Sequence, residues 1–239
     1  MPWVPGGDTA SMGSVSNKPS AVLWDMDGTL VDTEPYWIAI ETDLVESYGG
    51  TWSSEDALGL VGNALIDSAQ KLRQAGVDME PEAIVQLMTD RVGERLRIQG
   101  VPFRPGAREL LADLRAQGIP TALVTMSLRR MALGVLELID FPAFDFVVAG
   151  DDVEHPKPHP DPYLQAAGLL GVDIADAVVI EDSPTGVASG LASGATTLGV
   201  PHIVALDGLG AHELWPTLEG RTAADLADLH ARLSMGAAR

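Results

Sequence analysis

The sequence has no cysteine among its 239 residues, and it has little positive charge. Without cysteine, disulfide bonds, thiol nucleophiles and thiolate metal sites are excluded, and nothing marks a disulfide-stabilised secreted scaffold. Lysine and arginine together number 15 against 34 aspartate and glutamate residues, which gives a formal net charge of -19. Because the basic residues form no clustered stripe, we expect neither nucleic acid nor an anionic membrane surface as a partner.

Long apolar runs are also missing from the chain. No stretch approaches the roughly 20 apolar residues that a helix needs to cross a bilayer. The N-terminal segment is rich in Pro, Gly and Ser, and it lacks the basic region and apolar core of a signal peptide. We therefore expect residues 1–19 to form a flexible tail, with Met12 as a second candidate start, on a soluble cytoplasmic protein. The oligomeric state is not indicated.

Five short apolar runs are typical of buried strands. Most of their residues are β-branched or apolar without alternation, as in strands that are covered on both faces. The runs occupy residues 21–24, 121–124, 146–149, 177–180 and 196–200, with helical patterns between them, among others at 107–117, 128–138 and 184–193. This alternation predicts an α/β fold in which helices cover a parallel sheet.

The segment between the first two runs breaks this alternation. Residues 36–48, 64–75 and 84–96 carry helical patterns, and no convincing strand lies among them. Pro and Gly at Glu34-Pro35 and at residues 102–106 are typical of linkers. We therefore predict a helical cap at residues 34–104, inserted into a core formed by residues 20–33 and 105–239. Because its linkers leave from the edge where the first strand ends, the insertion could cover a site there as a lid.

The pentapeptide Asp25-Met26-Asp27-Gly28-Thr29 directly follows the first run. Asp-Gly is a common turn sequence, so a purely structural turn is one reading. A calcium loop of the EF-hand type is not favoured, because Gly28 and Tyr36 stand where that loop needs other residues. Ligands bind beyond the carboxyl ends of strands in open α/β sheets, and two nearby acids can divide the roles of nucleophile and proton carrier.

Each later strand also ends at polar residues. The second run leads into Thr125-Met126-Ser127, the third into a segment containing Lys157, and the fourth into Glu181-Asp182-Ser183. Thr125 could be only a helix cap and Lys157 only a solvated loop charge, although Lys157 is one of three lysines and stands between two prolines. Ser183 is best explained as an N-cap. In a parallel sheet these ends share one edge, so the side chains are expected to converge.

His155 and His159 have the spacing of paired metal ligands on a helix. Prolines at positions 156, 158 and 160 forbid a regular helix there, so we do not expect a zinc site.

Phosphoryl transfer suits the converging residues. A carboxylate nucleophile is repelled by an anionic phosphate ester, by about 4 kcal/mol for unit charges 4 Å apart at an effective dielectric of 20. Mg²⁺ held by Asp25, Asp182 and Glu181 would offset this repulsion, since Mg²⁺ prefers oxygen ligands and binds substrate phosphate. Lys157 and Thr125 would contact the oxygens on which transition-state charge is spread.

The ordered motifs, Asp25 to Leu30, then Thr125, Lys157 and Glu181-Asp182, resemble those of the haloacid dehalogenase superfamily, in particular its β-phosphoglucomutase-like branch. The resemblance covers residues 20–200 and implies a Rossmann-like parallel sheet with an inserted helical cap. It also implies roles for each residue: Asp25 as the nucleophile that forms an aspartyl phosphate, and Asp27 as the acid and base, with its backbone carbonyl on Mg²⁺. Thr125 and Lys157 would hold the phosphoryl group, and Glu181 and Asp182 would complete the metal site.

Two residues depart from the pattern of the superfamily. Met126 stands where relatives often have Asn, and Pro156 where Gly is common. Asp27, which the dehalogenases and phosphonate hydrolases of the superfamily lack, favours phosphate esters as substrates. Lys71 is the only lysine available for the cap lysine of a phosphonatase, and its surroundings differ from those expected.

We therefore predict a Mg²⁺-dependent phosphatase that acts on a small phosphorylated metabolite such as a sugar phosphate. A phosphosugar mutase and, more remotely, a phospho-aspartate receiver module are the alternatives. Substrate selection is assigned to the cap and to the edge of the site, with these candidates: Glu34, Gly62, Asn63 and Ser127, and also Tyr36 and Trp37, which could equally be cap core.

Overall fold

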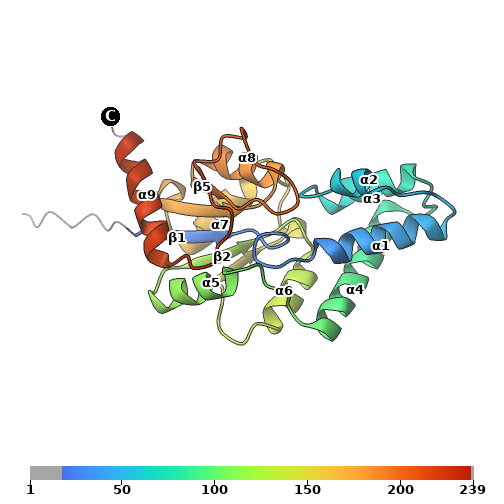
Figure 1. Cartoon of the computed structure of the whole chain (residues 1–239), viewed down its shortest axis with the longest axis horizontal. Helices are drawn as coiled ribbons and strands as arrows, with labels where there is room; N and C mark the ends of the chain where they lie inside the picture. The colour runs from blue at the N-terminus through green and yellow to red at the C-terminus, as the bar shows by residue number, and fades with distance from the viewer. Residues whose placement is uncertain (1–17, 238–239) are drawn as a thin grey trace, which may run out of the picture.

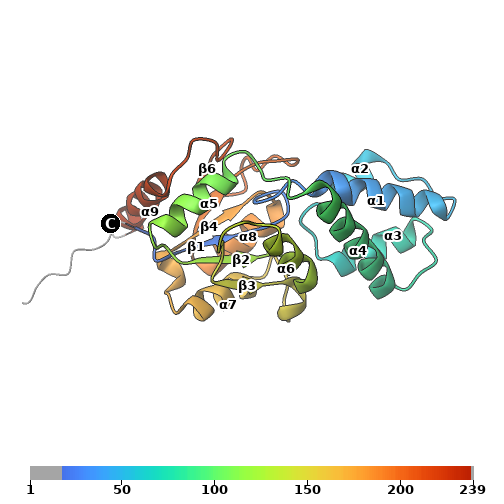
Figure 2. The ribbon, with the colours of Figure 1, turned by 90° about the horizontal axis from the view of Figure 1, so that it is seen from below.

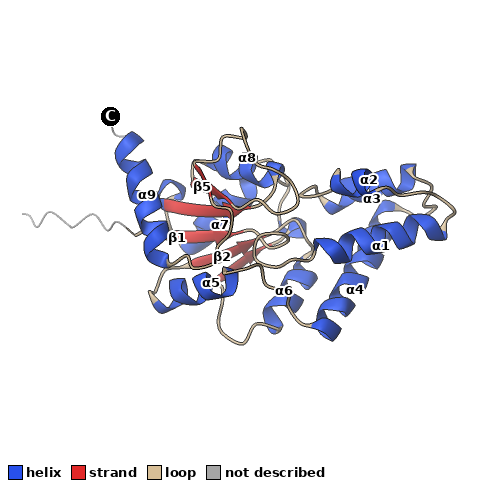
Figure 3. Ribbon diagram, viewed as in Figure 1, coloured by secondary structure: helices blue, strands red, loops and turns tan. Residues whose placement is uncertain are grey.

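A six-stranded parallel sheet forms the centre of the molecule in a computed structural model that describes residues 18–237 (Figures 1 and 3). The strand order is β3-β2-β1-β4-β5-β6, and every neighbouring pair is parallel. The strands are β1 (Ala21–Trp24), β2 (Thr121–Val124), β3 (Phe146–Val148), β4 (Ala177–Glu181), β5 (Thr196–Gly199) and β6 (Glu213–Leu214). The predicted α/β class is confirmed, and β6 is the strand that the sequence did not indicate.

The central strand β1 shows why its residues do not alternate in polarity. All four side chains are fully buried, but Val22 and Trp24 pack into one apolar cluster while Ala21 and Leu23 pack into another on the opposite face. Both faces of the sheet are therefore covered, as expected for a parallel sheet.

Helices cover the two faces of the sheet in separate groups (Figure 2). One face packs against α5 (Ala107–Ala116), α6 (Arg129–Glu137) and α9 (Ala223–Ala237), and the other against α7 (Asp161–Leu170) and α8 (Pro184–Ser193). Two short 3₁₀ helices, η1 (Gly150–Asp152) and η2 (Ile174–Asp176), precede α7 and β4. None of the helices in residues 18–237 is both long and apolar enough to span a bilayer.

Of the five helices between β1 and β2 in the chain, all but α5 stand beyond one end of the sheet (Figures 1 and 2). These inserted helices are α1 (Glu34–Ser47), α2 (Ser54–Leu58), α3 (Leu65–Gln74) and α4 (Pro81–Gln99). The chain segments that lead into and out of them pair with each other: the Asp32 amide donates to the Pro102 carbonyl at 2.7 Å, and the Arg104 amide to the Leu30 carbonyl at 2.9 Å. The insertion is therefore joined to the sheet by two adjacent segments.

One boundary differs from the sequence prediction. Glu34 is not part of a linker but the first residue of α1, and its side chain is buried. Pro35 occupies the first turn of this helix, where its missing N–H costs nothing. Of the predicted tail, residues 1–17 lie outside the described part of the chain.

Candidate active site

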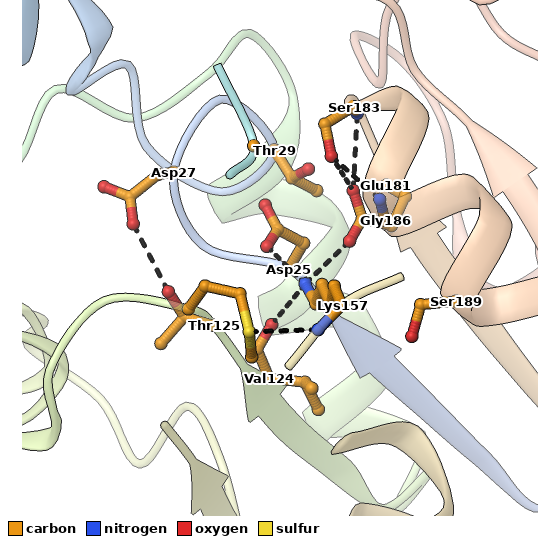
Figure 4. Close-up of polar contacts among 12 residues, drawn as sticks. Asp25, Asp27, Thr29, Val124, Thr125, Lys157, Glu181, Ser183, Gly186 and Ser189 are labelled. Atoms are coloured by element: carbon orange, nitrogen blue, oxygen red, sulfur yellow. Dashed lines mark hydrogen bonds and ion pairs between the residues drawn. The ribbon is translucent and has the colours of Figure 1, made fainter. Parts of the chain in front are cut away.

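The polar residues predicted at the strand ends lie together at the carboxyl edge of the sheet (Figure 4). Asp25 follows β1, Thr125 follows β2, and Lys157 lies in the loop between η1 and α7. Glu181 is the last residue of β4 and Asp182 is the next. The parallel register between β1 and β4 continues past Trp24, since the Asp25 amide donates to the Ile180 carbonyl at 3.1 Å. Backbone pairing thus fixes the two acidic segments side by side.

Lys157 is buried among acceptors and uses all three of its donors. Its Nζ donates to Asp25 Oδ1 at 2.7 Å, to Glu181 Oε1 at 2.7 Å and to the Val124 carbonyl at 2.9 Å. Burial opposes the charge, but the two carboxylates outweigh it, so the pKa of Lys157 lies above its usual value. Met126, one of the two departures from the expected motif, supports this loop, because its Sδ accepts from the Lys157 amide at 3.3 Å.

Asp25 has one bonded and one free oxygen. Oδ1 accepts from Lys157, whereas Oδ2 is buried and has no hydrogen-bond partner. Burial and then the neighbouring Glu181 raise the pKa of Asp25 to about 7, despite the opposing effect of Lys157. The free oxygen is therefore available for a metal ion or for attack on a substrate.

The carboxylates of Asp25, Glu181 and Asp182 outnumber the single lysine between them. One oxygen from each lies within 4.8 Å of the others, and all three residues are buried. Burial, followed by Asp25, raises the pKa of Asp182 well above its usual value. Excess negative charge, oxygen donors and the free Oδ2 of Asp25 together fit a hard divalent cation such as Mg²⁺.

Glu181 is already saturated with protein donors. Its Oε1 accepts from Lys157 and from the Tyr163 hydroxyl, each at 2.7 Å. Its Oε2 accepts from the Asp182 amide at 3.1 Å and from the Ser183 amide at 3.3 Å and hydroxyl at 3.2 Å. Glu181 therefore holds Lys157 and the loop after β4 in place, and its direct ligation of a metal stays a prediction. Tyr163 was not indicated by the sequence pattern.

Two glycines allow the acidic groups to approach the backbone closely. Gly28 has a φ of +88°, and a Cβ at this position would lie 2.0 Å from Asp182 Oδ2. A Cβ at Gly186 on α8 would lie 1.9 Å from the Glu181 carboxylate. Any larger residue at either position would displace a carboxylate of the site.

Asp27 is held by four donors, two on each oxygen. Oδ1 accepts from the Thr33 hydroxyl and from Trp37 Nε1 at 3.3 Å, and Oδ2 accepts from the hydroxyls of Thr125 at 3.3 Å and Ser127 at 2.7 Å. Thr33 and Trp37 belong to the start of the insertion, whereas Thr125 and Ser127 follow β2. Asp27 thus joins the sheet edge to α1, and its carboxylate faces the same cavity as Asp25.

The cavity has one wall from the sheet edge and another from the inserted helices. Asp25, Asp27, Thr125, Ser127 and Lys157 line the first wall. On the second wall, α1 contributes Glu34, Trp37, Ile38 and Glu41, and the segment between α2 and α3 contributes Gly62 and Asn63. All the predicted substrate-contacting residues except Tyr36 therefore lie around one space. Glu41 is an addition that the sequence did not single out.

Three of the weaker candidates are partly committed to other contacts. The Gly62 carbonyl accepts from the Thr185 hydroxyl at 2.6 Å, which ties the insertion to α8. The side-chain amide of Asn63 donates to the Gly59 carbonyl at 2.9 Å. Tyr36 is not in the cavity lining, and its hydroxyl donates to Gln99 at 2.7 Å.

The histidine pair lies outside this cavity. No helix forms at residues 155–159, as the prolines predict, yet the rings of His155 and His159 stack with centroids 4.7 Å apart. Asp161 contacts both rings, at 2.7 Å and 3.0 Å. A turn therefore brings together the same residues that a helix would, and the expectation that they bind no zinc stays a prediction.

Comparison with known proteins agrees with this geometry. The family model for haloacid dehalogenase-like hydrolases matches residues 22–200. The chain is 31% identical over 186 residues to hexitol phosphatase B of Escherichia coli, covering 76% of this chain and 83% of the relative.

Two further similarities have narrower meaning. A bifunctional riboflavin kinase/FMN phosphatase of Arabidopsis thaliana is 31% identical over 194 residues, 80% of this chain, but the chain spans only half of that relative's length. The crystal structure of β-phosphoglucomutase from Clostridium difficile matches with a TM-score of 0.79, covering 91% of this chain and 99% of the other, at 19% identity. At that identity the match shows the shared fold.

Proposed function

Because the chain belongs to the family of haloacid dehalogenase-like hydrolases, we propose that it is a Mg²⁺-dependent phosphatase for small phosphate monoesters, including sugar phosphates. The observation that carries the proposal is the arrangement of Asp25, whose Oδ1 is fixed by Lys157 while Oδ2 is free in the cavity lining. A carboxylate held in this way can act as a nucleophile with little loss of conformational entropy.

Asp25 Oδ2 would form a bond to phosphorus while the bond between phosphorus and the ester oxygen breaks. Asp27 would donate a proton to the leaving oxygen, so that the product alcohol departs neutral. In the second half of the reaction, Asp27 would take a proton from the water that attacks the aspartyl phosphate. That attack releases inorganic phosphate, frees the Asp25 carboxylate and leaves Asp27 protonated for the next cycle.

Mg²⁺ bound by Asp25, Asp182 and the Asp27 carbonyl would supply positive charge that offsets the repulsion between substrate and acidic site. Lys157 supplies a second positive charge at Asp25 Oδ1. We assign Thr125 to a hydrogen bond with the phosphoryl oxygens during the reaction. This assignment is supported by the position of Thr125 in the cavity lining, where its hydroxyl donates to Asp27 at 3.3 Å.

We also propose that residues 34–104 form a mobile cap over a core made of residues 20–33 and 105–239. Two adjacent segments connect the parts, and residues of both line one cavity. Closure would exclude water while the aspartyl phosphate forms, and reopening would admit the water that hydrolyses it.

A phosphosugar mutase would use the same nucleophile and return the phosphoryl group to a reoriented intermediate instead of water. Release of one phosphate for each substrate consumed favours the phosphatase, whereas dependence on a sugar bisphosphate activator favours the mutase. A receiver module is not supported, because its short domain lacks the four inserted helices seen here.

The test is phosphate release from a panel of sugar and polyol monophosphates with Mg²⁺, with Asp25→Asn as the control. We expect turnover by the wild type and a loss of at least about 1,000-fold in the variant, in line with removal of nucleophiles in other enzymes. Equal activity in Asp25→Asn would exclude Asp25 as the nucleophile. The absence of phosphate release from every monoester would contradict the proposed function itself.

A further inference from the structure

One face of α1 forms an acidic part of the cavity wall opposite Lys157. Glu34, Trp37, Ile38 and Glu41 follow each other at helical spacing, so that their side chains share this face, and all four line the cavity. Glu34 is 7% exposed and Glu41 is 5% exposed. Glutamate is seldom buried to this extent unless it has a partner.

Neither glutamate has a cationic partner. Of the ion pairs among residues 18–237, none involves Glu34 or Glu41. Glu41 Oε2 is buried and accepts no hydrogen bond of normal geometry, and Trp52 Nε1 likewise has no partner of normal geometry, although hydrogen bonding from Trp52 opposes the rise in the pKa of Glu41. Burial raises the pKa of Glu41 to about 7, with a smaller opposing effect of Trp52, and burial followed by Asp27 and Glu41 raises the pKa of Glu34 to about 8. Buried polar groups of this kind normally have hydrogen-bond partners, which a ligand in the cavity could supply.

The cavity offers no positive charge for a second anionic group. Among the described residues that line it, Lys157 is the only cation, and all three of its donors are engaged at the sheet edge. Lys71 on α3 lies outside the lining, and its ammonium donates to the Gly59 carbonyl at 3.0 Å. A second phosphate on the substrate would thus meet two carboxyl groups, which is unfavourable, whereas a hydroxyl group could donate to them.

We propose that Glu34 and Glu41 select the substrate's leaving group, favouring phosphate monoesters whose far end carries hydroxyl groups and disfavouring those that carry a second anion. The proposal rests on the proposed phosphatase function and names its substrate class: polyol or sugar monophosphates, not bisphosphates. The hydroxyl groups would replace the missing partners of Glu41. The experiment is therefore made at a pH above about 8, where both glutamates are ionised and the acidic wall would repel a distal phosphate. Such repulsion argues against a mutase, which must bind a bisphosphate.

The experiment compares kcat/KM for three phosphate esters: a hexitol 6-phosphate, a hexose 1,6-bisphosphate, and p-nitrophenyl phosphate as a monoester without hydroxyl groups. Glu41→Gln keeps an acceptor oxygen but removes the charge, and Glu41→Leu removes both. The double variant Glu34→Gln/Glu41→Gln removes both charges. Glu46→Gln, an exposed glutamate on the same helix, is the matched control.

Charge removal in the double Gln variant should raise kcat/KM for the bisphosphate relative to the hexitol phosphate by about tenfold, as expected for one buried charged contact. Loss of the acceptor in Glu41→Leu should lower kcat/KM for the hexitol phosphate relative to p-nitrophenyl phosphate by about tenfold, with a smaller change in Glu41→Gln. Glu46→Gln should leave both ratios unchanged.

A wild-type preference for the bisphosphate would overturn the proposal. So would unchanged ratios in the double Gln variant, which would assign the two glutamates to the packing of α1. If Glu41→Leu does not fold, the charge-removing variants still decide the result. Turnover of monophosphates with unchanged ratios would refute only the selectivity, whereas no turnover of any ester would refute the phosphatase function as well.

Discussion

The two walls of the cavity differ in how their charged groups are satisfied. On the sheet side, Lys157 makes three polar contacts, Glu181 accepts five hydrogen bonds and Asp27 accepts four. On the side of the inserted helices, Glu41 Oε2 has no partner, and neither Glu34 nor Glu41 forms an ion pair within the described chain.

This difference matches the two ends of a phosphate monoester. The phosphoryl end is the same in every substrate, so a rigid, extensively bonded network can be built for it in advance, with Asp25 Oδ2 left without a protein partner for the reaction. The leaving group varies between substrates, and groups that lack partners in the protein are those that a particular leaving group can satisfy. We therefore propose that the residues of the sheet wall perform the chemistry and that those of the inserted helices select the leaving group.

The largest expected effect concerns Lys157 on the sheet side. Lys157→Met leaves Asp25 and Glu181 without their shared counter-charge, so we expect the free energy of unfolding to fall by about 3–5 kcal/mol. The exposed Lys71→Met variant should change it by less than about 0.5 kcal/mol. Chemical denaturation of the metal-free proteins measures both free energies of unfolding. Equal effects of the two variants would show that the buried Lys157 contributes no more to stability than the exposed Lys71.

Asp27 tests whether the sheet wall performs proton transfer. Asp27→Asn should lower kcat/KM for an alkyl phosphate by about 100- to 1,000-fold, because the leaving alkoxide then departs without a proton. The loss should be smaller for p-nitrophenyl phosphate, whose leaving group needs no proton, and absent in the exposed control Asp43→Asn. Equal losses for both esters would indicate that Asp27 only supports the structure.

Metal addition tests the excess negative charge at the sheet edge. Mg²⁺ at 100 times its dissociation constant should stabilise the folded protein by about 2.7 kcal/mol. The Asp182→Asn variant should lose most of this gain, because it lacks one expected ligand. Burial and then Asp25 raise the pKa of this ligand in the metal-free protein. Thermal unfolding with and without Mg²⁺ gives the answer, and an undiminished gain in the variant would place the metal elsewhere.

The smallest effect concerns Glu41 on the other wall. Its pKa of about 7 in the folded protein, raised by burial, lies above the usual 4.5, so unfolding releases a proton between these values. Stability therefore falls as the pH rises from 4.5 to 7, and Glu41→Gln should remove this loss. We expect the variant to gain about 1–2 kcal/mol at pH 8 and nothing near pH 4.

Urea unfolding across this pH range, with Glu46→Gln for comparison, measures the gain. If the free energies of unfolding of wild type and Glu41→Gln differ by the same amount at all pH values, burial does not raise the pKa of Glu41.

Much of the fold was readable because the buried strands have unbroken apolar runs. The predicted strands at 121–124 and 177–180 agree with β2 and with β4, which extends one residue further to include Glu181. The pair Glu213–Leu214 could not be found in this way, because a two-residue strand has no pattern of its own and is set by pairing with β5. Tertiary contacts decide such elements.

The sheet side of the site was also readable, since its residues stand at strand ends in a parallel sheet. Tyr163 and Glu41 could not be predicted, because their roles depend on packing. Tyr163 donates a hydrogen bond to Glu181, and Glu41 is buried beside the cavity. For Glu41 a signal existed, namely its position seven residues after Glu34 on one helical face. The connection of Asp27 to Thr33 and Trp37 likewise depends on how the chain turns into α1.

The central claim is that Asp25 attacks phosphorus and carries the phosphoryl group. The direct measurement is to mix the protein with Mg²⁺ and a readily hydrolysed monoester, quench with acid during turnover, and map phosphoryl groups on its peptides by mass spectrometry. We expect one phosphoryl group on Asp25, which disappears in Asp25→Asn. A phosphoryl group on another residue, or turnover without any phosphoenzyme, would contradict it.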